Sequence, residues 1–99
     1  MIVVISAEAE SDLDEIASYI AERSAEIALN FLRELRERCE SLADATRGYP
    51  LVPRYEHFGI RRRPFGNYLI FYRVGPGAIE VVHIIHGARE YEPLLFPER

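Results

Sequence analysis

Two histidines near the end of the chain have the clearest capacity for chemistry. His83 and His86 lie in residues 78–86, whose alternating pattern is typical of a β-strand. Their spacing points the two imidazoles to opposite faces of that strand, so they cannot share one metal ion and no metal site is expected. His86 alone, with Arg89 and Tyr91 just beyond the strand, could act as a general acid. The alternative is a structural histidine at a strand end.

The run Arg61-Arg62-Arg63 resembles a nucleic-acid-binding patch. In a strand, however, Arg62 points opposite to its two neighbours, so the three side chains do not form one cluster. The chain has a net charge of −4, divided into −7 over residues 1–45 and +3 over residues 46–99. Generic binding to duplex phosphates is therefore not expected, and these arginines are predicted to lie at a strand edge in solvent or to face a partner's carboxylates.

The remaining reactive side chains suggest little catalysis. Glu8, Asp12, Glu15 and Glu22 lie on or near one helical stripe, which predicts a solvated face. Cys39 falls on an apolar stripe and is expected to be a small buried hydrophobe. All 12 basic residues are arginine, and the absence of lysine and of a glycine-rich phosphate loop argues against Schiff-base and Walker-type chemistry, so no cofactor is expected. A single cysteine and short apolar runs favour a cytoplasmic protein without a membrane segment.

The first half of the chain predicts one strand and two helices. Residues 2–5 are β-branched, and Ser6 is a typical cap for the helix that follows. Apolar residues over 9–21 recur with the spacing of one buried helical face. Ser24 is a second cap, and the next amphipathic pattern continues to about Ala45. The short link between them predicts an antiparallel helical hairpin.

The second half predicts three strands at residues 57–63, 67–74 and 78–86, separated by turns that contain proline and glycine. The order is therefore β-α-α-β-β-β. We expect an α+β fold in which the helical hairpin packs on one face of a small, mainly antiparallel sheet. A single domain should span residues 1–99, with residues 87–99 as a C-terminal extension.

Both faces of the predicted sheet are apolar. Ile70 and Tyr72 alternate with Leu69 and Phe71, while the hairpin can cover only one side. We interpret the second face as an apolar groove that a partner chain fills, and the alternative is a strand partly covered by the C-terminal tail. The residues expected on this face are Ile60, Leu69, Phe71 and Val81.

The tail itself is unusually apolar. Leu94, Leu95 and Phe96 are bracketed by Pro93 and Pro97, which limit the triplet to one helical turn or an extended segment. Such a segment cannot bury itself, so it must pack on the sheet or contact another protein.

Three segments together resemble the ParE branch of the RelE/ParE toxins: SAEAESDLDEI at residues 6–16, GNYLIFYRV at residues 66–74 and IIHGAR at residues 84–89. The resemblance covers nearly the whole chain. It implies the toxin of a bacterial type II toxin-antitoxin pair, neutralised in a hetero-oligomer by a ParD-like ribbon-helix-helix antitoxin. It also implies inhibition of DNA gyrase by binding, without catalysis.

RelE toxins, the other branch, cut messenger RNA on the ribosome with basic residues on the sheet. The matching positions here are Ile60, Arg62, Leu69 and Arg89, with a tail aromatic position near Leu95. Only two of them are basic, and one lost preorganised cation commonly removes about 3 to 4 kcal/mol of transition-state stabilisation. A ribosome-dependent RNase that uses Arg62, His86 and Arg89 therefore remains an alternative, as does an inactive scaffold that titrates an antitoxin.

The resemblance and the strand pattern together predict two contact surfaces, and no direct specific binding to nucleic acid. The antitoxin is expected to contact Ile60, Arg62, Leu69, Phe71, Arg73, Val81 and His83. The target is expected to contact the tail through Arg89, Tyr91, Leu94, Leu95 and Phe96.

Overall fold

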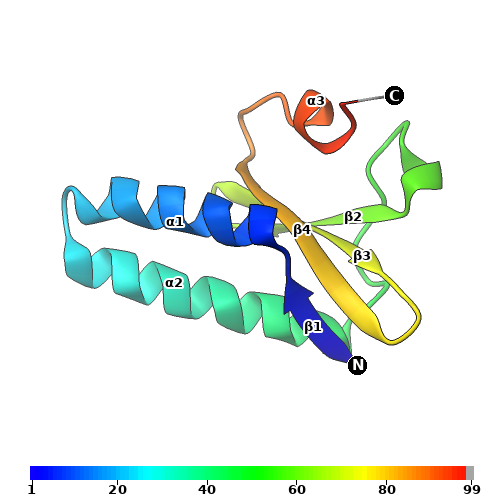
Figure 1. The fold of residues 1–99 in the computed structure, drawn as a ribbon, viewed down its shortest axis with the longest axis horizontal. Helices are drawn as coiled ribbons and strands as arrows, with labels where there is room; N and C mark the ends of the chain where they lie inside the picture. Colours follow the sequence, from blue (N-terminus) through cyan, green and yellow to red (C-terminus); the bar gives the residue numbers. More distant parts are fainter. Residues whose placement is uncertain (98–99) are drawn as a thin grey trace.

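A helical hairpin packs on a four-stranded sheet in the computed structural model, which describes residues 1–97 (Figure 1). The elements are β1 (Ile2–Ile5), α1 (Ala7–Ala21), α2 (Ala25–Glu40), β2 (Ile60–Phe65), β3 (Tyr68–Val74), β4 (Ala78–His86) and α3 (Glu92–Leu95), with short 3-10 turns at Ser41–Asp44 and Glu56–Phe58. The predicted order β-α-α-β-β-β is confirmed, followed by one helical turn. No helix among the described residues is long and apolar enough to cross a membrane.

The sheet has the strand order β1-β4-β3-β2. The last three strands form an antiparallel meander, and β1 pairs in parallel with the first half of β4, from Ala78 to Val81. The prediction of a mainly antiparallel sheet is therefore confirmed. Because β1 pairs only with the first half of β4, the second half of β4 has no strand neighbour on that side among the described residues.

The predicted caps begin both helices of the hairpin. The Ser6 hydroxyl accepts a hydrogen bond from the Ala9 N–H at 3.1 Å and donates to the Val82 carbonyl at 3.1 Å. Ser24 accepts from the Ile27 N–H at 3.2 Å. Ser6 therefore ends β1, begins α1 and ties the helix to β4.

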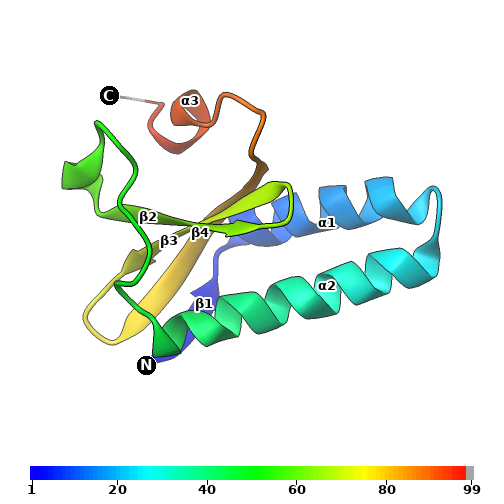
Figure 2. The same cartoon turned by 180° about the vertical axis from the view of Figure 1, so that it is seen from behind.

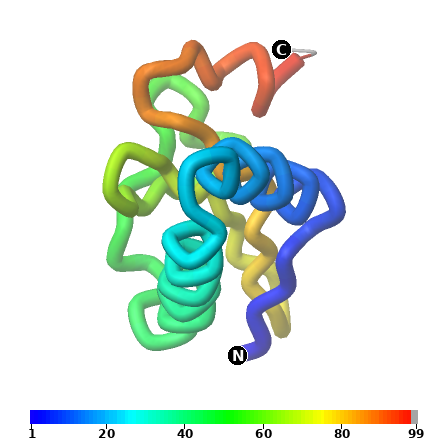
Figure 3. Tube along the Cα trace, turned by 90° about the vertical axis from the view of Figure 1, so that its left-hand side faces the viewer, coloured from blue at the N-terminus to red at the C-terminus, as the bar shows by residue number. Residues whose placement is uncertain are grey.

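The main core lies between the hairpin and the sheet. Cys39 is buried there as predicted, and burial raises the pKa of its thiol to about 11, which leaves it protonated and unreactive at neutral pH. The hairpin projects beyond the sheet (Figures 1 and 3), so Ala21 at its far end is exposed although it lies on the predicted apolar face. The buried residues of this core are Ala9, Leu13, Leu35, Cys39, Leu42, Ile70, Tyr72, Ile79, Val81 and Ile84.

Two predicted boundaries are wrong. The strand expected over residues 57–63 begins at Ile60, because a 3-10 turn and Gly59, at a φ of 74°, redirect the backbone just before it. The second helix ends at Glu40 and tightens into the 3-10 turn of Ser41–Asp44. Apolar periodicity continues through both changes, so it does not mark them.

An ion pair on the outer surface links α1 to α2. Glu10 accepts from Arg36 at 2.9 Å, and this hydrogen bond holds the pKa of Glu10 below its ordinary value of 4.5. A lowered carboxyl pKa stabilises the fold above that ordinary value, and the contribution is lost as the pH falls through the lowered pKa. Both side chains are 44% exposed, so solvent screening keeps the contribution below about 0.5 kcal/mol.

We therefore expect Glu10→Gln to lower the free energy of unfolding slightly at pH 7 and to have no effect at pH 2. Urea unfolding of both proteins at the two pH values measures this. An equal difference at both pH values would show that the effect does not come from the charge.

Candidate functional site

The face of the sheet turned away from the hairpin carries a second apolar cluster. Its buried members come from the segment before β2, from three strands and from the tail: Val52, Ile60, Phe71, Ile85 and Phe96. The prediction that both faces of the sheet are apolar is confirmed. The segment before β2 and α3 are neighbours in both views of the chain (Figures 1 and 2).

The tail fills the centre of this second face. The Tyr91 ring lies 4.9 Å from Phe71, and the Phe96 ring stacks on Tyr55 at 4.3 Å and contacts Phe58 at 4.7 Å. The interpretation of this face as an open groove is therefore wrong for its centre. The alternative, cover by the C-terminal tail, is what the chain adopts, and this packing leaves Phe96 only 4% exposed.

Polar contacts fix the start of the tail. Arg62 donates to the Tyr91 hydroxyl at 2.6 Å, and Arg54 contacts the Glu92 carboxylate at 3.5 Å. Since Arg54 is exposed, its ion pair contributes little. The Arg62 bond is half-buried and orients the Tyr91 ring over the sheet.

The five predicted target contacts therefore have different environments. Arg89 and Leu94 are exposed, Tyr91 and Leu95 are half-buried, and Phe96 is buried within the chain. Only Arg89 and Leu94 are freely available to a partner while the tail is docked.

Val81 does not lie on the second face. Tyr72 pairs with Val81 and Phe71 pairs with His83, so Val82 is an extra residue in β4. Such a β-bulge reverses the alternation of side chains beyond it. Val81 consequently packs beneath the hairpin with no exposed surface, and the prediction that it contributes to the second face is wrong.

Four of the predicted antitoxin contacts keep accessible surface: Leu69, Arg62 and Arg73 on the second face, and His83, which is half-buried. Leu69 and Arg62 are half-buried, and Arg73 is exposed and paired with Glu80 at 2.5 Å. Ile60 and Phe71 lie on the same face beneath the tail and the segment before β2. A partner reaches these last two only if the tail moves.

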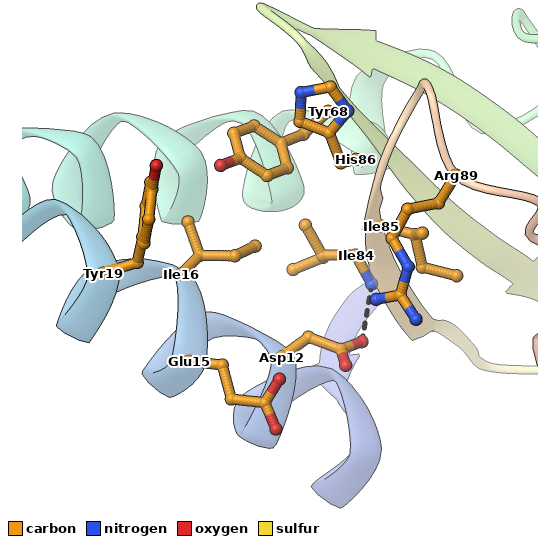
Figure 4. Close-up of a pocket in the computed structure, with 9 residues that line it drawn as sticks. All are labelled: Asp12, Glu15, Ile16, Tyr19, Tyr68, Ile84, Ile85, His86 and Arg89. Carbon is orange, nitrogen blue, oxygen red and sulfur yellow. Dashed lines mark hydrogen bonds between the residues drawn. The ribbon is translucent and has the colours of Figure 1, made fainter.

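His83 and Asp12 form a contact that sequence analysis missed. The Asp12 carboxylate accepts from the Ile84 N–H at 2.9 Å (Figure 4). The same carboxylate oxygen lies 2.8 Å from Nδ1 of His83. Because β1 ends opposite Val81, this carboxylate supplies the acceptor for one backbone N–H in the second half of β4. Asp12 is therefore half-buried, not part of a fully solvated acidic face.

A hollow of about 390 Å³ lies beside this contact, between α1 and the ends of β3 and β4 (Figure 4). His86 and Tyr68 meet there edge to face at 5.3 Å. The Ala88 N–H donates to Nδ1 of His86 at 3.1 Å, so the neutral ring carries its proton on Nε2. The lining residues are Asp12, Glu15, Ile16, Tyr19, Tyr68, Ile84, Ile85, His86 and Arg89.

The residues of the RNase alternative are not assembled around one point. His86 pairs with Tyr68 and faces the hairpin side, where Arg89 joins it in the hollow. Arg62 pairs with Phe71 and faces the opposite side of the sheet. General acid catalysis and phosphate stabilisation at one scissile bond require these groups on the same face.

The alternation of the three arginines is confirmed, but their environment differs from the prediction. Arg61 donates to the Tyr49 carbonyl at 2.7 Å, and Arg63 donates to the Arg38 carbonyl at 2.9 Å near the end of α2. These two guanidinium groups donate to backbone oxygens near the end of α2 and in the loop after it, and of the three arginines only Arg62 lies on the second face.

The sequence model of the family described as "ParE toxin of type II toxin-antitoxin system, parDE" matches residues 3–91. The chain belongs to the ParE toxin family. The match includes the whole hairpin and all of the sheet except Ile2, and it confirms the resemblance drawn from three short segments.

One relative agrees with this assignment to the ParE family, and one solved structure has the same fold. Toxin ParE1 from Caulobacter vibrioides is 32% identical over 83 residues, which are 83% of this chain and 84% of the relative. A solved structure described as the chromosomal ParDE TA system from P. aeruginosa shares the fold, with a TM-score of 0.72, 24% identity and coverage of 87% of this chain and 95% of that chain. The family match ends at Tyr91, so α3 and Phe96 lie beyond it.

Proposed function

We propose that this ParE-type toxin inhibits DNA gyrase by binding and that a ParD-like ribbon-helix-helix antitoxin neutralises it in a hetero-oligomer. The match of the ParE family model to residues 3–91 carries this proposal. Two features of the sheet support a non-catalytic mode of action. An apolar Leu69 stands where RelE nucleases have a cation, and Arg62 lies on the opposite face from His86. Membership of this toxin class also supports a cytoplasmic location.

For the antitoxin, we propose the second face as the docking surface. Leu69, Arg62 and Arg73 are accessible predicted contacts on this face, and they combine an apolar centre with two guanidinium groups for antitoxin carboxylates. An antitoxin that also covers Ile60 and Phe71 displaces the tail, so part of its binding energy offsets the loss of the tail contacts.

The experiment is gyrase supercoiling with the purified chain and its antitoxin. We expect the toxin to make relaxed plasmid accumulate and the antitoxin to restore supercoiling. Leu69→Arg should still inhibit gyrase while its affinity for the antitoxin falls about tenfold, because a charge replaces a half-buried apolar contact. Ile27→Arg, an exposed apolar residue on α2, is the matched control and should behave as wild type.

Several outcomes would contradict the proposal. Undisturbed supercoiling with tight antitoxin binding would favour the inactive scaffold, and cleavage of messenger RNA in stalled ribosomes would favour the RelE-like RNase. Equal antitoxin affinities for the Leu69→Arg and Ile27→Arg variants would remove the second face as the docking surface.

A further inference from the structure

A second hollow, of about 340 Å³, lies at the start of β2, beside the end of β3 and the loop that follows α2. Three arginines from separate parts of the chain line it: Arg47 from the loop after α2, Arg61 from β2 and Arg73 from β3. His57 and Phe58 line it as well, and Glu56 is the one acidic residue among its described lining. We propose that this hollow binds single-stranded nucleic acid, one phosphate on the arginines and one base on Phe58.

The positive charge in the hollow is only partly neutralised. The guanidinium of Arg47 makes no hydrogen bond or ion pair within residues 1–97. Arg61 is held in place by the Tyr49 carbonyl at 2.7 Å through Nη1, so its remaining N–H groups stay available as donors. Arg73 is paired with Glu80 and adds less. Two planar guanidinium groups, one of them pre-positioned by the backbone, suit the tetrahedral oxygens of a phosphate.

An aromatic platform stands beside these cations. Phe58 is 42% exposed although its ring contacts Phe96 at 4.7 Å, so the contact fixes the ring while part of the residue stays accessible to a base. The His57 ring lies 4.3 Å from it and widens the platform. Guanidinium groups next to an exposed aromatic ring are the arrangement with which proteins bind single strands, because every base offers a flat face.

The distribution of charge makes this local site compatible with an acidic protein. The net charge of −4 arises from residues 1–45, which carry −7 and include the hairpin, whereas residues 46–99 carry +3 and include the hollow. A duplex keeps its bases stacked and offers none to Phe58, so a single strand fits better than a duplex. An acidic peptide would use the arginines and leave the aromatic platform without a role. This inference does not depend on the gyrase proposal.

Fluorescence anisotropy of a labelled 12-nucleotide oligo-dT with the free toxin tests the proposal. We expect weak binding that falls with salt. Arg47→Ala should weaken it about threefold or more and reduce the slope of log affinity against log salt by about 0.7, the value for one contact to a single strand. Phe58→Ala should weaken binding with no change in slope, because it removes stacking and not charge.

Matched controls separate a site from general electrostatics. Arg33→Ala removes the same charge from α2, where the side chain is 64% exposed, and should leave affinity and slope unchanged. A duplex of the same length should bind more weakly than the single strand. Because Arg47 is exposed, its variant should keep the circular dichroism spectrum and the melting temperature of the wild type.

Four results would overturn the proposal. One is an absence of oligonucleotide binding at low salt, and another is an equal loss of affinity from Arg33→Ala and Arg47→Ala. A third is displacement of the oligonucleotide by hexaglutamate at lower concentration than by unlabelled oligo-dT, which would assign the hollow to an acidic peptide. The fourth is competition by inorganic phosphate at sub-millimolar concentration, together with an unchanged oligonucleotide affinity of the Phe58→Ala variant. This result would make the hollow a site for free phosphate.

Discussion

Phe96→Ala should lower the free energy of unfolding by about 2 to 3 kcal/mol, although the residue lies next to the last described residue, Pro97. The side chain is 4% exposed and stacks on Tyr55 at 4.3 Å. Its removal leaves a cavity over the second face and frees α3, whose one turn is too short to persist alone. Urea unfolding followed by circular dichroism measures the loss.

Leu94→Ala is the matched control for this prediction. Leu94 is 41% exposed on the same helical turn, so its replacement should change the stability by no more than about 0.5 kcal/mol. Equal effects of the two substitutions would show that Phe96 does not hold the tail on the sheet in solution. Testing both variants in the supercoiling assay then separates the roles, because loss of inhibition by Leu94→Ala without loss of stability would identify a target contact.

Asp12→Ala is expected to cost about 2 kcal/mol of stability. One carboxylate oxygen accepts the Ile84 N–H at 2.9 Å and lies 2.8 Å from His83, and hydrogen bonds to charged groups contribute about 1.5 to 3 kcal/mol. The substitution leaves the Ile84 N–H on the open half of β4 without its acceptor and loosens α1 from the sheet. Thermal or urea unfolding at pH 7 measures the change.

Two further variants make the Asp12 prediction specific. Asp12→Asn keeps an acceptor oxygen for the Ile84 N–H and should lose about half as much stability. Glu15→Ala removes an exposed carboxylate one turn along the same helix and should change stability by less than about 0.5 kcal/mol. If Glu15→Ala and Asp12→Ala are equally destabilising, the effect comes from the helix charge and not from the contact with β4.

The sequence by itself determined the features that depend on neighbouring residues. The helix caps at Ser6 and Ser24, the order of the elements and the opposite orientation of Arg62 all follow from local hydrogen bonding and from the two-residue and 3.6-residue periods of strand and helix. The apolar character of both sheet faces follows from the same alternation. The sequence also contained enough of the family pattern for the ParE resemblance to be drawn correctly.

The placement of several candidate residues was decided only by the tertiary structure. Val81 faces away from the second face because Val82 is an extra residue opposite β3. Such a bulge cannot be recognised in the sequence here, because residues on both faces of the strand are apolar. The hydrogen bond between Asp12 and Ile84 joins residues 72 positions apart. In the sequence, Asp12 looks like any other solvent-exposed acid on a helix, so the contact could not be predicted.

The surface on which the tail packs was also decided only by the tertiary structure. Its sequence showed that Leu94, Leu95 and Phe96 needed an apolar surface, but not which surface was free. Tyr55 and Phe58 form the receiving site only after Gly59 turns the chain into β2, which places them over the second face. Local propensity fixes which residues must be buried, whereas the choice of partner depends on contacts between segments that meet only in the folded chain.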